Sequence, residues 1–254
     1  MKRLIVCLSI VVLCTLPYSF SRGDSTKIAI IKADDVWNRT PKWDRFFEIS
    51  QEKGVKVSAG VICNSLAGNN QSYEDWLREL HDSGWVEFWN HGWDHKRWTT
   101  DEDVKFSEFG GTGYAHQKKH FDDAQAIMKH VFGKAPIAFG SPYNACDADT
   151  LKVMNEDPDL RLFFCYGRVG LKDKVLARMH LRGENDGTGE PNFKKFKAAY
   201  RQENERSFSA LQFHPNSFSD EHFVEYAKIL DFLIARGWTF MQPAEYVATM
   251  TQAE

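Results

Sequence analysis

Short apolar or β-branched runs recur along the chain, separated by longer stretches in which apolar residues return every three or four positions. The short runs predict strands at 28–33, 55–62, 85–89, 136–139, 160–165, 176–181, 210–213 and 238–241. The longer stretches predict helices at 43–53, 73–82, 114–132, 147–155 and 221–236. Glycine follows several of these stretches, as expected where a helix ends in a left-handed residue: Gly54, Gly84, Gly133 and Gly237.

The alternation of strands with helices predicts an α/β fold built from βαβ units around a mostly parallel sheet. Seven or eight strands are enough to close such a sheet into a barrel, and in a barrel the chemistry gathers at the carboxyl ends of the strands. No internal repeat or linker divides the chain, so we expect one catalytic domain over residues 22–254.

The first 21 residues have the layout of a secretory signal peptide. Two basic residues follow Met1, an apolar run covers 4–16, and small residues come next. We therefore expect an exported protein that is periplasmic, attached to the cell surface or secreted. No second apolar stretch approaches the roughly 20 residues of a membrane-spanning helix, so we expect no stable membrane insertion after the signal is removed.

Charge and cysteine content exclude two classes of function. The chain carries 32 basic and 35 acidic residues, a formal net charge of -3, so it has no excess of positive charge to bind nucleic acid. Three cysteines lie beyond the signal: Cys63, Cys146 and Cys165. They permit at most one internal disulfide, which leaves one or three free thiols, and none are spaced as a C-x-x-C metal site.

Polar residues follow four of the predicted strands. Asp34 and Asp35 end the first strand, and two adjacent buried carboxylates would raise each other's pKa. A metal relieves that cost by binding one carboxylate, while the other stays free to accept a proton. The alternative for an isolated pair is a turn or a helix cap.

His91 and His95 are four residues apart, which on a helical turn would place both imidazoles on one side. Neutral imidazole suits zinc, cobalt, nickel and iron. His116 and His120 have the same spacing, but they lie in a helical stretch with lysines that is typical of a solvated face. The context therefore favours His91 and His95 as the metal ligands.

The order of four motifs resembles that of the polysaccharide deacetylases, carbohydrate esterase family 4, over residues 28–246. The motifs are the aspartate pair after the first strand, the histidine pair, a Pro-Tyr turn and a late Leu-x-x-His, here Asp34-Asp35, His91–His95, Gly140–Tyr143 and Leu211–His214. The resemblance implies a distorted (β/α) barrel with about seven strands.

The resemblance also implies roles. Asp35, His91 and His95 would bind one divalent metal ion, with zinc the first choice and cobalt, nickel or iron as alternatives. Asp34 would be the general base, the backbone N–H of Tyr143 would stabilise the oxyanion, and His214 would protonate the leaving group. The implied reaction is hydrolysis of N- or O-linked acetyl groups on an extracytoplasmic polysaccharide or glycan.

Two departures from the family pattern stand out. Gly140 occupies the place of an arginine that usually orients the base, and Arg168 or Arg182 are candidate substitutes. The family's Asp-x-x-Asp-Trp-like motif has no counterpart in 162–168. Trp37, Trp93 and Arg182 are the candidate substrate-binding residues, because aromatic rings stack on sugars.

The departures keep two other functions open. One is a carbohydrate-binding protein, or different carbohydrate-active chemistry on the same metal-binding barrel. The other is a non-haem iron oxygenase with a two-His-one-carboxylate ligand set, against which the aspartate pair and the Leu-x-x-His motif argue. The pattern predicts neither the sugar nor the oligomeric state.

Overall fold

The computed structural model describes residues 26–68, 70–167, 170–202 and 207–251. The signal peptide expected at 1–21 lies outside these ranges. Within them, every helix is too short or too polar to span a bilayer.

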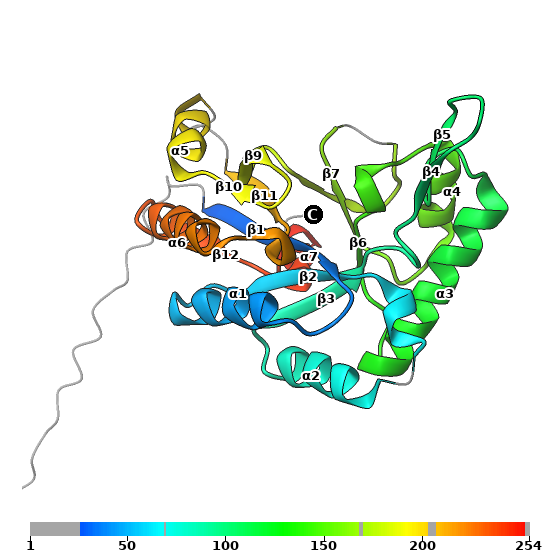
Figure 1. The fold of residues 1–254 in the computed structure, drawn as a ribbon, viewed down its shortest axis with the longest axis horizontal. Coiled ribbons are helices and arrows are strands. Elements are labelled where there is room, and N and C mark those ends of the chain that lie inside the picture. The colour runs from blue at the N-terminus through cyan, green and yellow to red at the C-terminus, as the bar shows by residue number, and fades with distance from the viewer. Residues whose placement is uncertain (1–25, 69, 168–169, 203–206, 252–254) are drawn as a thin grey trace, which may run out of the picture.

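A sheet of eight parallel strands forms the centre of the molecule (Figure 1). Seven of them follow one another in space, and β12 (Trp238–Phe240) pairs with the beginning of β1. The spatial order is β11 (Phe208–Phe213), β1 (Lys27–Val36), β2 (Val57–Val61), β3 (Val86–Asn90), β6 (Ala138–Phe139), β7 (Leu162–Cys165) and β8 (Val175–Arg178). The backbone N–H of Leu181, just beyond β8, donates to Ser209 Oγ of β11 at 2.9 Å, so the ends of the sheet nearly meet. The predicted α/β barrel is confirmed.

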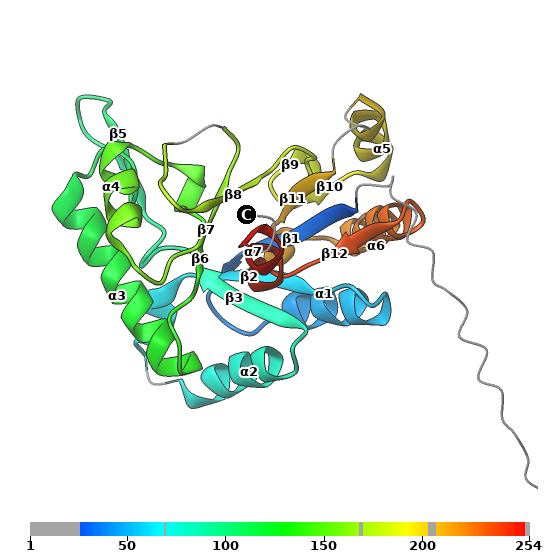
Figure 2. The same cartoon turned by 180° about the vertical axis from the view of Figure 1, so that it is seen from behind.

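Helices surround the sheet, as the front and back views show (Figures 1 and 2). They are α1 (Pro41–Glu52), α2 (Gln71–Asp82), α3 (Tyr114–Phe132), α4 (Ala148–Glu156), α5 (Phe193–Gln202), α6 (Asp220–Ile234) and α7 (Pro243–Thr251). Short 3-10 turns lie at η1 (Cys63–Leu66), η2 (Pro142–Asn144) and η3 (Pro215–Ser217). All predicted strands and helices are present, whereas α5 and α7 were not predicted.

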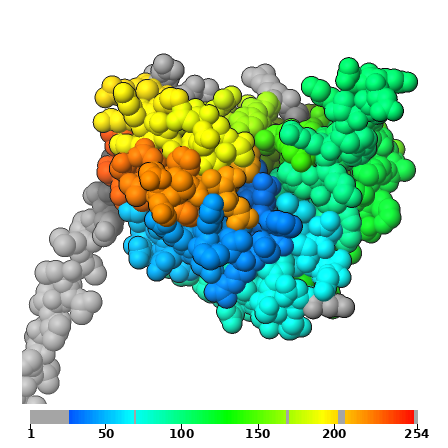
Figure 3. All heavy atoms as spheres, viewed as in Figure 1, coloured from blue at the N-terminus to red at the C-terminus, as the bar shows by residue number. Residues whose placement is uncertain are grey.

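Two antiparallel hairpins also go beyond the predicted elements. They are β4 (Arg97–Thr99) with β5 (Lys105–Ser107), and β9 (Glu184–Gly187) with β10 (Glu190–Pro191). In Figure 3, the yellow segment that contains β10 and α5 and the green segment that contains α3 stand on opposite sides of the molecule. Residues 184–188 of the β9 hairpin line a cavity beside β11, which the sequence pattern did not indicate.

Side chains alternate between the two faces of β1. Ala29, Ile31 and Ala33 pack in the cluster beneath the helices, whereas Ile30 packs in the cluster inside the barrel. Lys32 follows the same alternation as Ile30, and it is completely buried. The alternation of side chains along β1 therefore places the Lys32 side chain inside the barrel.

Trp89 of β3 fills the barrel interior below the site. Its ring is fully buried, and glycines on two neighbouring segments make room for it. A Cβ added at Gly60 would lie 2.3 Å from Trp89 Cη2, and one at Gly140 would lie 2.7 Å from Trp89 Cζ3. Trp89 is therefore a packing residue, and the backbone at Gly140 approaches it too closely for any side chain.

Candidate active site

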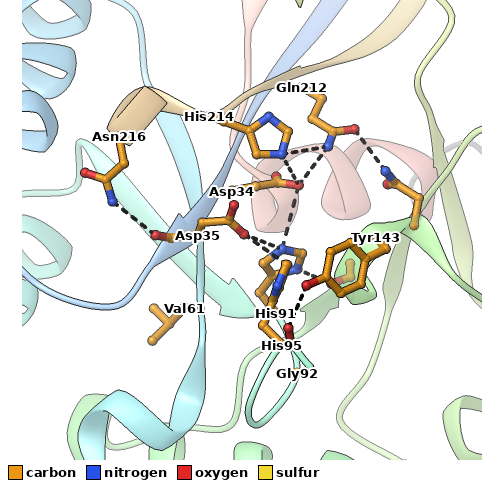
Figure 4. A network of polar contacts seen from close by, with 12 residues as sticks. Asp34, Asp35, Val61, His91, Gly92, His95, Tyr143, Gln212, His214 and Asn216 are labelled. Carbon is orange, nitrogen blue, oxygen red and sulfur yellow. Dashed lines mark hydrogen bonds and ion pairs between the residues drawn. The ribbon is translucent and has the colours of Figure 1, made fainter. Parts of the chain in front are cut away.

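The two aspartates lie at an irregularity near the end of β1. The register between β1 and β2 shifts between Ala33 and Val36, and Asp35 has a positive φ of 72°. This bulge breaks the alternation of the strand, so neighbouring carboxylates reach the same end of the barrel. Asp34 is buried and Asp35 is half-buried. Figure 4 shows that both carboxylates face the His91 ring.

The two predicted histidine ligands meet at Asp35. Its Oδ1 lies 3.1 Å from His91 Nε2 and 3.2 Å from His95 Nε2. The histidines do not sit on a helical turn as expected, because residues 91–96 form an irregular loop. Positive φ values at Gly92 and His95, 79° and 54°, bend this loop so that the second imidazole folds back toward the first.

These three side chains fit a divalent cation. Their ligand atoms all lie within 4.8 Å of one another. His91 Nδ1 is 2.5 Å from the Gly140 carbonyl oxygen, which can only accept, so Nδ1 carries the proton. In the neutral ring Nε2 then directs its lone pair at the Asp35 carboxylate, and a cation between the two relieves their repulsion. Two imidazoles and one carboxylate are also a common catalytic zinc set.

Asp35 keeps its negative charge in this setting. Burial alone would raise the pKa of Asp35, but the hydrogen bonds and positive charges of His91 and His95, when these rings are protonated, outweigh burial and hold that pKa well below its usual range. A bound cation would take the place of these protons. The ionised carboxylate is the form that binds metals.

Backbone strain gathers at the site. Six described non-glycine residues have positive φ, and four of them lie here: Asp35, His95, Tyr143 and Asn144. Such conformations cost on the order of 1–3 kcal/mol each and persist where surrounding structure enforces them. Their concentration marks this end of the barrel as the functional one.

Asp34 is held by a buried lysine that the sequence analysis missed. Lys32 Nζ lies 2.6 Å from Asp34 Oδ1 and 2.5 Å from Oδ2, and neither side chain is more than 2% exposed. Gln212 Nε2 of β11 donates to Asp34 Oδ2 at 2.9 Å. His91 Nε2 and His214 Nε2 each lie 3.8 Å from the same oxygen.

Lys32 stands where the missing motif arginine would act. A Cβ at Gly140 would lie 3.2 Å from Lys32 Cε, so the lysine occupies space that a side chain at position 140 would need. Arg182 does not take this role, because its guanidinium lies over the Tyr166 ring. Arg168 lies outside the described residues. The sequence held a signal for Lys32, since a lysine inside an apolar strand two positions before Asp34 shares its face.

His214 is paired with Glu184, another residue that the sequence analysis missed. Glu184 Oε2 lies 2.7 Å from His214 Nδ1, and its Oε1 accepts the His214 backbone N–H at 2.5 Å. Burial alone would lower the pKa of His214, but the hydrogen bond to Glu184 and the negative charges of Asp34 and Glu184 outweigh burial and raise it. A carboxylate from β9 thus holds the proposed acid in place.

The other predicted site residues are placed as follows. Tyr143 donates its hydroxyl to the His95 carbonyl at 2.9 Å, and the two rings are 4.4 Å apart. Trp37 is 59% exposed just beyond Asp35, whereas Trp93 packs against the core. Arg182 is exposed at the rim of a cavity beside His214.

His116 and His120 do not lie on a solvated face, so that expectation is wrong. Both are half-buried with rings 4.0 Å apart, and His120 Nδ1 lies 3.0 Å from Glu108 Oε1. The buried Glu108 carboxylate also accepts the backbone N–H groups of Trp93 and His95, at 2.5 and 2.7 Å. With the N–H of Asp94 as a fourth donor, its acceptor sites are filled. Glu108 therefore holds the loop that carries His95, and we assign no metal to the group of Asp94, Glu108 and His120.

The fold and motifs agree with known proteins. A family model described as polysaccharide deacetylase matches residues 21–158, more than half of the chain. A family 4 acetyl xylan esterase from Clostridium thermocellum, solved with a cobalt ion, has a TM-score of 0.63 at 18% identity, over 88% of this chain and 91% of that one. No curated protein matches the chain at a significant level.

Two further solved structures are similar. The peptidoglycan deacetylase from Bacillus subtilis has a TM-score of 0.58 at 15% identity, over 90% of this chain and 94% of that one. A family 4 pseudoenzyme from Bacillus anthracis has a TM-score of 0.61 at 9% identity, over 87% of this chain and 66% of that one. At these identities the matches establish a shared fold.

Proposed function

Because this chain belongs to the polysaccharide deacetylase family, we propose that it is a metal-dependent hydrolase that removes N- or O-linked acetyl groups from an extracytoplasmic polysaccharide or glycan. One observation carries the proposal. The Asp34 carboxylate sits between the candidate metal ligands and His214, with its Oδ2 3.8 Å from His91 Nε2 and 3.8 Å from His214 Nε2. A base and an acid thus flank the place where a scissile bond would lie.

The metal would be held by Asp35, His91 and His95. A divalent ion bound there, zinc first and cobalt, nickel or iron as alternatives, polarises the acetyl carbonyl and acidifies water. Asp34 accepts the proton of the attacking water at a carboxylate that Lys32 and Gln212 hold in a fixed orientation. The backbone N–H of Tyr143 donates to the oxyanion that develops.

His214 donates a proton to the departing amine or alcohol. Its Nδ1 is engaged with Glu184, which leaves Nε2 to face Asp34 and the substrate. The raised pKa supports this assignment, because an acid must be protonated before the leaving group departs. The predicted export of the chain supports a substrate outside the cytoplasm.

The test is acetate release by the purified mature protein from acetylated xylan, chitin oligosaccharides and peptidoglycan, measured beside the metal content by elemental analysis. We expect release that stops on treatment with a chelator and returns with added zinc or cobalt. No release from any substrate by protein with about one metal ion per chain would contradict the proposal.

The second candidate is a carbohydrate-binding protein without turnover. Similarity to a family 4 pseudoenzyme motivates it, as do the two departures from the family motifs. The enzyme is favoured because Lys32 holds the proposed base and Glu184 holds the proposed acid, so both proton-transfer residues have a charged partner. Sugar binding by metal-loaded protein without acetate release would favour the binding protein.

A further inference from the structure

A cavity of about 320 Å³ opens beside the proposed acid. Gln212 and His214 form part of its wall, so a ligand bound in it would touch the groups that surround Asp34. The remaining walls come from the end of β7, the segment after β8 and the β9 hairpin, with Tyr166, Arg182, Asn185 and Thr188 among the lining residues. The volume is at the lower end of the range for small-molecule sites.

Each carboxylate at this cavity already has a cationic partner. Glu184 holds His214, at 2.7 Å between Oε2 and Nδ1. Asp186 forms an ion pair with Lys195. Asp34, behind Gln212, is held by the buried lysine described above. The negative charges of the wall are thus balanced from within the protein.

Arg182 has no such partner. Its side chain is exposed in the cavity, and no carboxylate of the described residues forms an ion pair with it. Its guanidinium carbon lies 6.0 Å from the centre of the Tyr166 ring. Tyr166 is in turn fixed by its hydroxyl, which donates to Gln212 Oε1 at 2.9 Å, and the residue remains 46% exposed. Among the described residues, the cavity therefore presents one cation without a carboxylate partner, next to an anchored aromatic ring.

We propose that this cavity binds a sugar residue that carries a carboxylate, and that Arg182 makes the enzyme selective for acidic glycans. This inference rests on the proposed function, because it names the substrate class of the same site. A guanidinium matches a carboxylate with two parallel hydrogen bonds, and the exposed face of Tyr166 offers a surface for the sugar ring. Asn185 and Thr188 supply polar partners for hydroxyls.

The experiment measures binding by calorimetry with ligands that cannot react. The probes are unacetylated uronic acid oligosaccharides from pectin, alginate and glucuronoxylan, each compared with its own methyl ester, which removes the charge and keeps the backbone. We expect at least one acid to bind metal-loaded wild-type protein about tenfold or more tightly than its ester, the size of a charge-assisted hydrogen bond. The preference should shrink as salt is raised.

Two variants locate the effect. Arg182→Gln should bind each acid and its ester equally well. Arg201→Gln removes the same charge from exposed α5, outside the cavity, and should keep the wild-type preference. No preference in the wild type for any pair, or a preference that survives in Arg182→Gln, would overturn the inference.

The two proposals fail separately. Preferential binding of acids with no acetate release from any substrate would remove the proposed function and leave the charge-selective site. Equal acetate release from acetylated acidic and neutral glycans, together with equal binding of the acid and ester probes, would remove the inference and leave the hydrolase.

Discussion

At the scale of single residues, the ion pair between Lys32 and Asp34 combines structural and chemical roles. Both side chains are buried inside the barrel, where an unpaired charge is costly. Lys32 Nζ also lies 4.9 Å from the centre of the Trp89 ring. The ion pair thus fixes the orientation of the proposed base. It also gives each buried charge a partner, which lowers the free-energy cost of burying both charges in the barrel.

Lys32→Met should lower the free energy of unfolding by about 3–5 kcal/mol, because it leaves the Asp34 charge buried without a partner. Lys32→Met/Asp34→Asn should recover part of this loss, which denaturant unfolding of both single variants and the double variant can measure. Folded Lys32→Met should keep its metal, because Lys32 contacts no proposed ligand, but lose turnover. Strictly additive stability changes would show that the two charges do not interact.

Glu184 should set the pH range over which His214 remains an acid. The pKa of His214 is raised in the folded protein, so its interaction with Glu184 stabilises the fold fully below the unfolded pKa of about 6.5. That contribution is lost as pH rises through the higher folded pKa. In Glu184→Gln, the limb of the kcat/KM profile that falls at high pH should therefore move to lower pH.

A charge-matched control lies in the same hairpin. Glu190→Gln changes an exposed carboxylate on β10 and should leave the profile where it is in the wild type. An unmoved limb in Glu184→Gln would mean that another group titrates in that range.

At the scale of elements, the loop after β3 depends on Glu108, since three backbone N–H groups of the loop converge on this one carboxylate. Glu108→Gln replaces an acceptor oxygen with a donor and should loosen the loop, weakening metal affinity about 10- to 100-fold, as such supporting contacts do elsewhere. Competition with a chelator measures the change.

The control is His116→Ala, which should leave the metal affinity unchanged. A loss of metal affinity in His116→Ala as large as that in Glu108→Gln would mean that the whole α3 face supports the site.

Elements with strong periodicity could be predicted from the sequence, and the residues that support the site could not. The strand that carries Lys32 was predicted as an apolar run, and its alternation places Lys32 and Asp34 on one face. Only the structure shows that this face lies inside the closed barrel, where the two charges are buried together. Glu184 lies on β9, whose short sequence of Glu, Asn, Asp and Gly lacks strand propensity. Its pairing with His214, 30 positions away, comes from tertiary structure alone. The β9–β10 hairpin escaped prediction for this reason, whereas β4 and β5 were missed because each has only three residues.

At the scale of the whole molecule, the barrel needs no disulfide. Cys63, Cys146 and Cys165 are all free. The sequence allowed one or three free thiols, and the structure has three. Burial, the largest effect, raises the pKa of all three thiols, that of Cys146 to about 11. Because the thiolate is the reactive form, each should react slowly in the folded protein.

Titration of the mature protein with a thiol reagent should find three thiols after denaturation without reductant. The native protein should react slowly under the same conditions. A count of one after denaturation would reveal an internal disulfide and contradict the structure.

We propose that one aspartate of the adjacent pair binds the metal and the other moves the proton. Metal content measured together with turnover in Asp34→Asn and Asp35→Asn separates the two roles. Asp34→Asn removes the proton acceptor, so turnover should fall about 10²- to 10⁴-fold while metal content stays near the wild type. Asp35→Asn removes the carboxylate that lies 3.1 and 3.2 Å from the two imidazoles, so metal content and turnover should fall together. If Asp34→Asn loses its metal while Asp35→Asn keeps it, the roles assigned to the two aspartates are wrong.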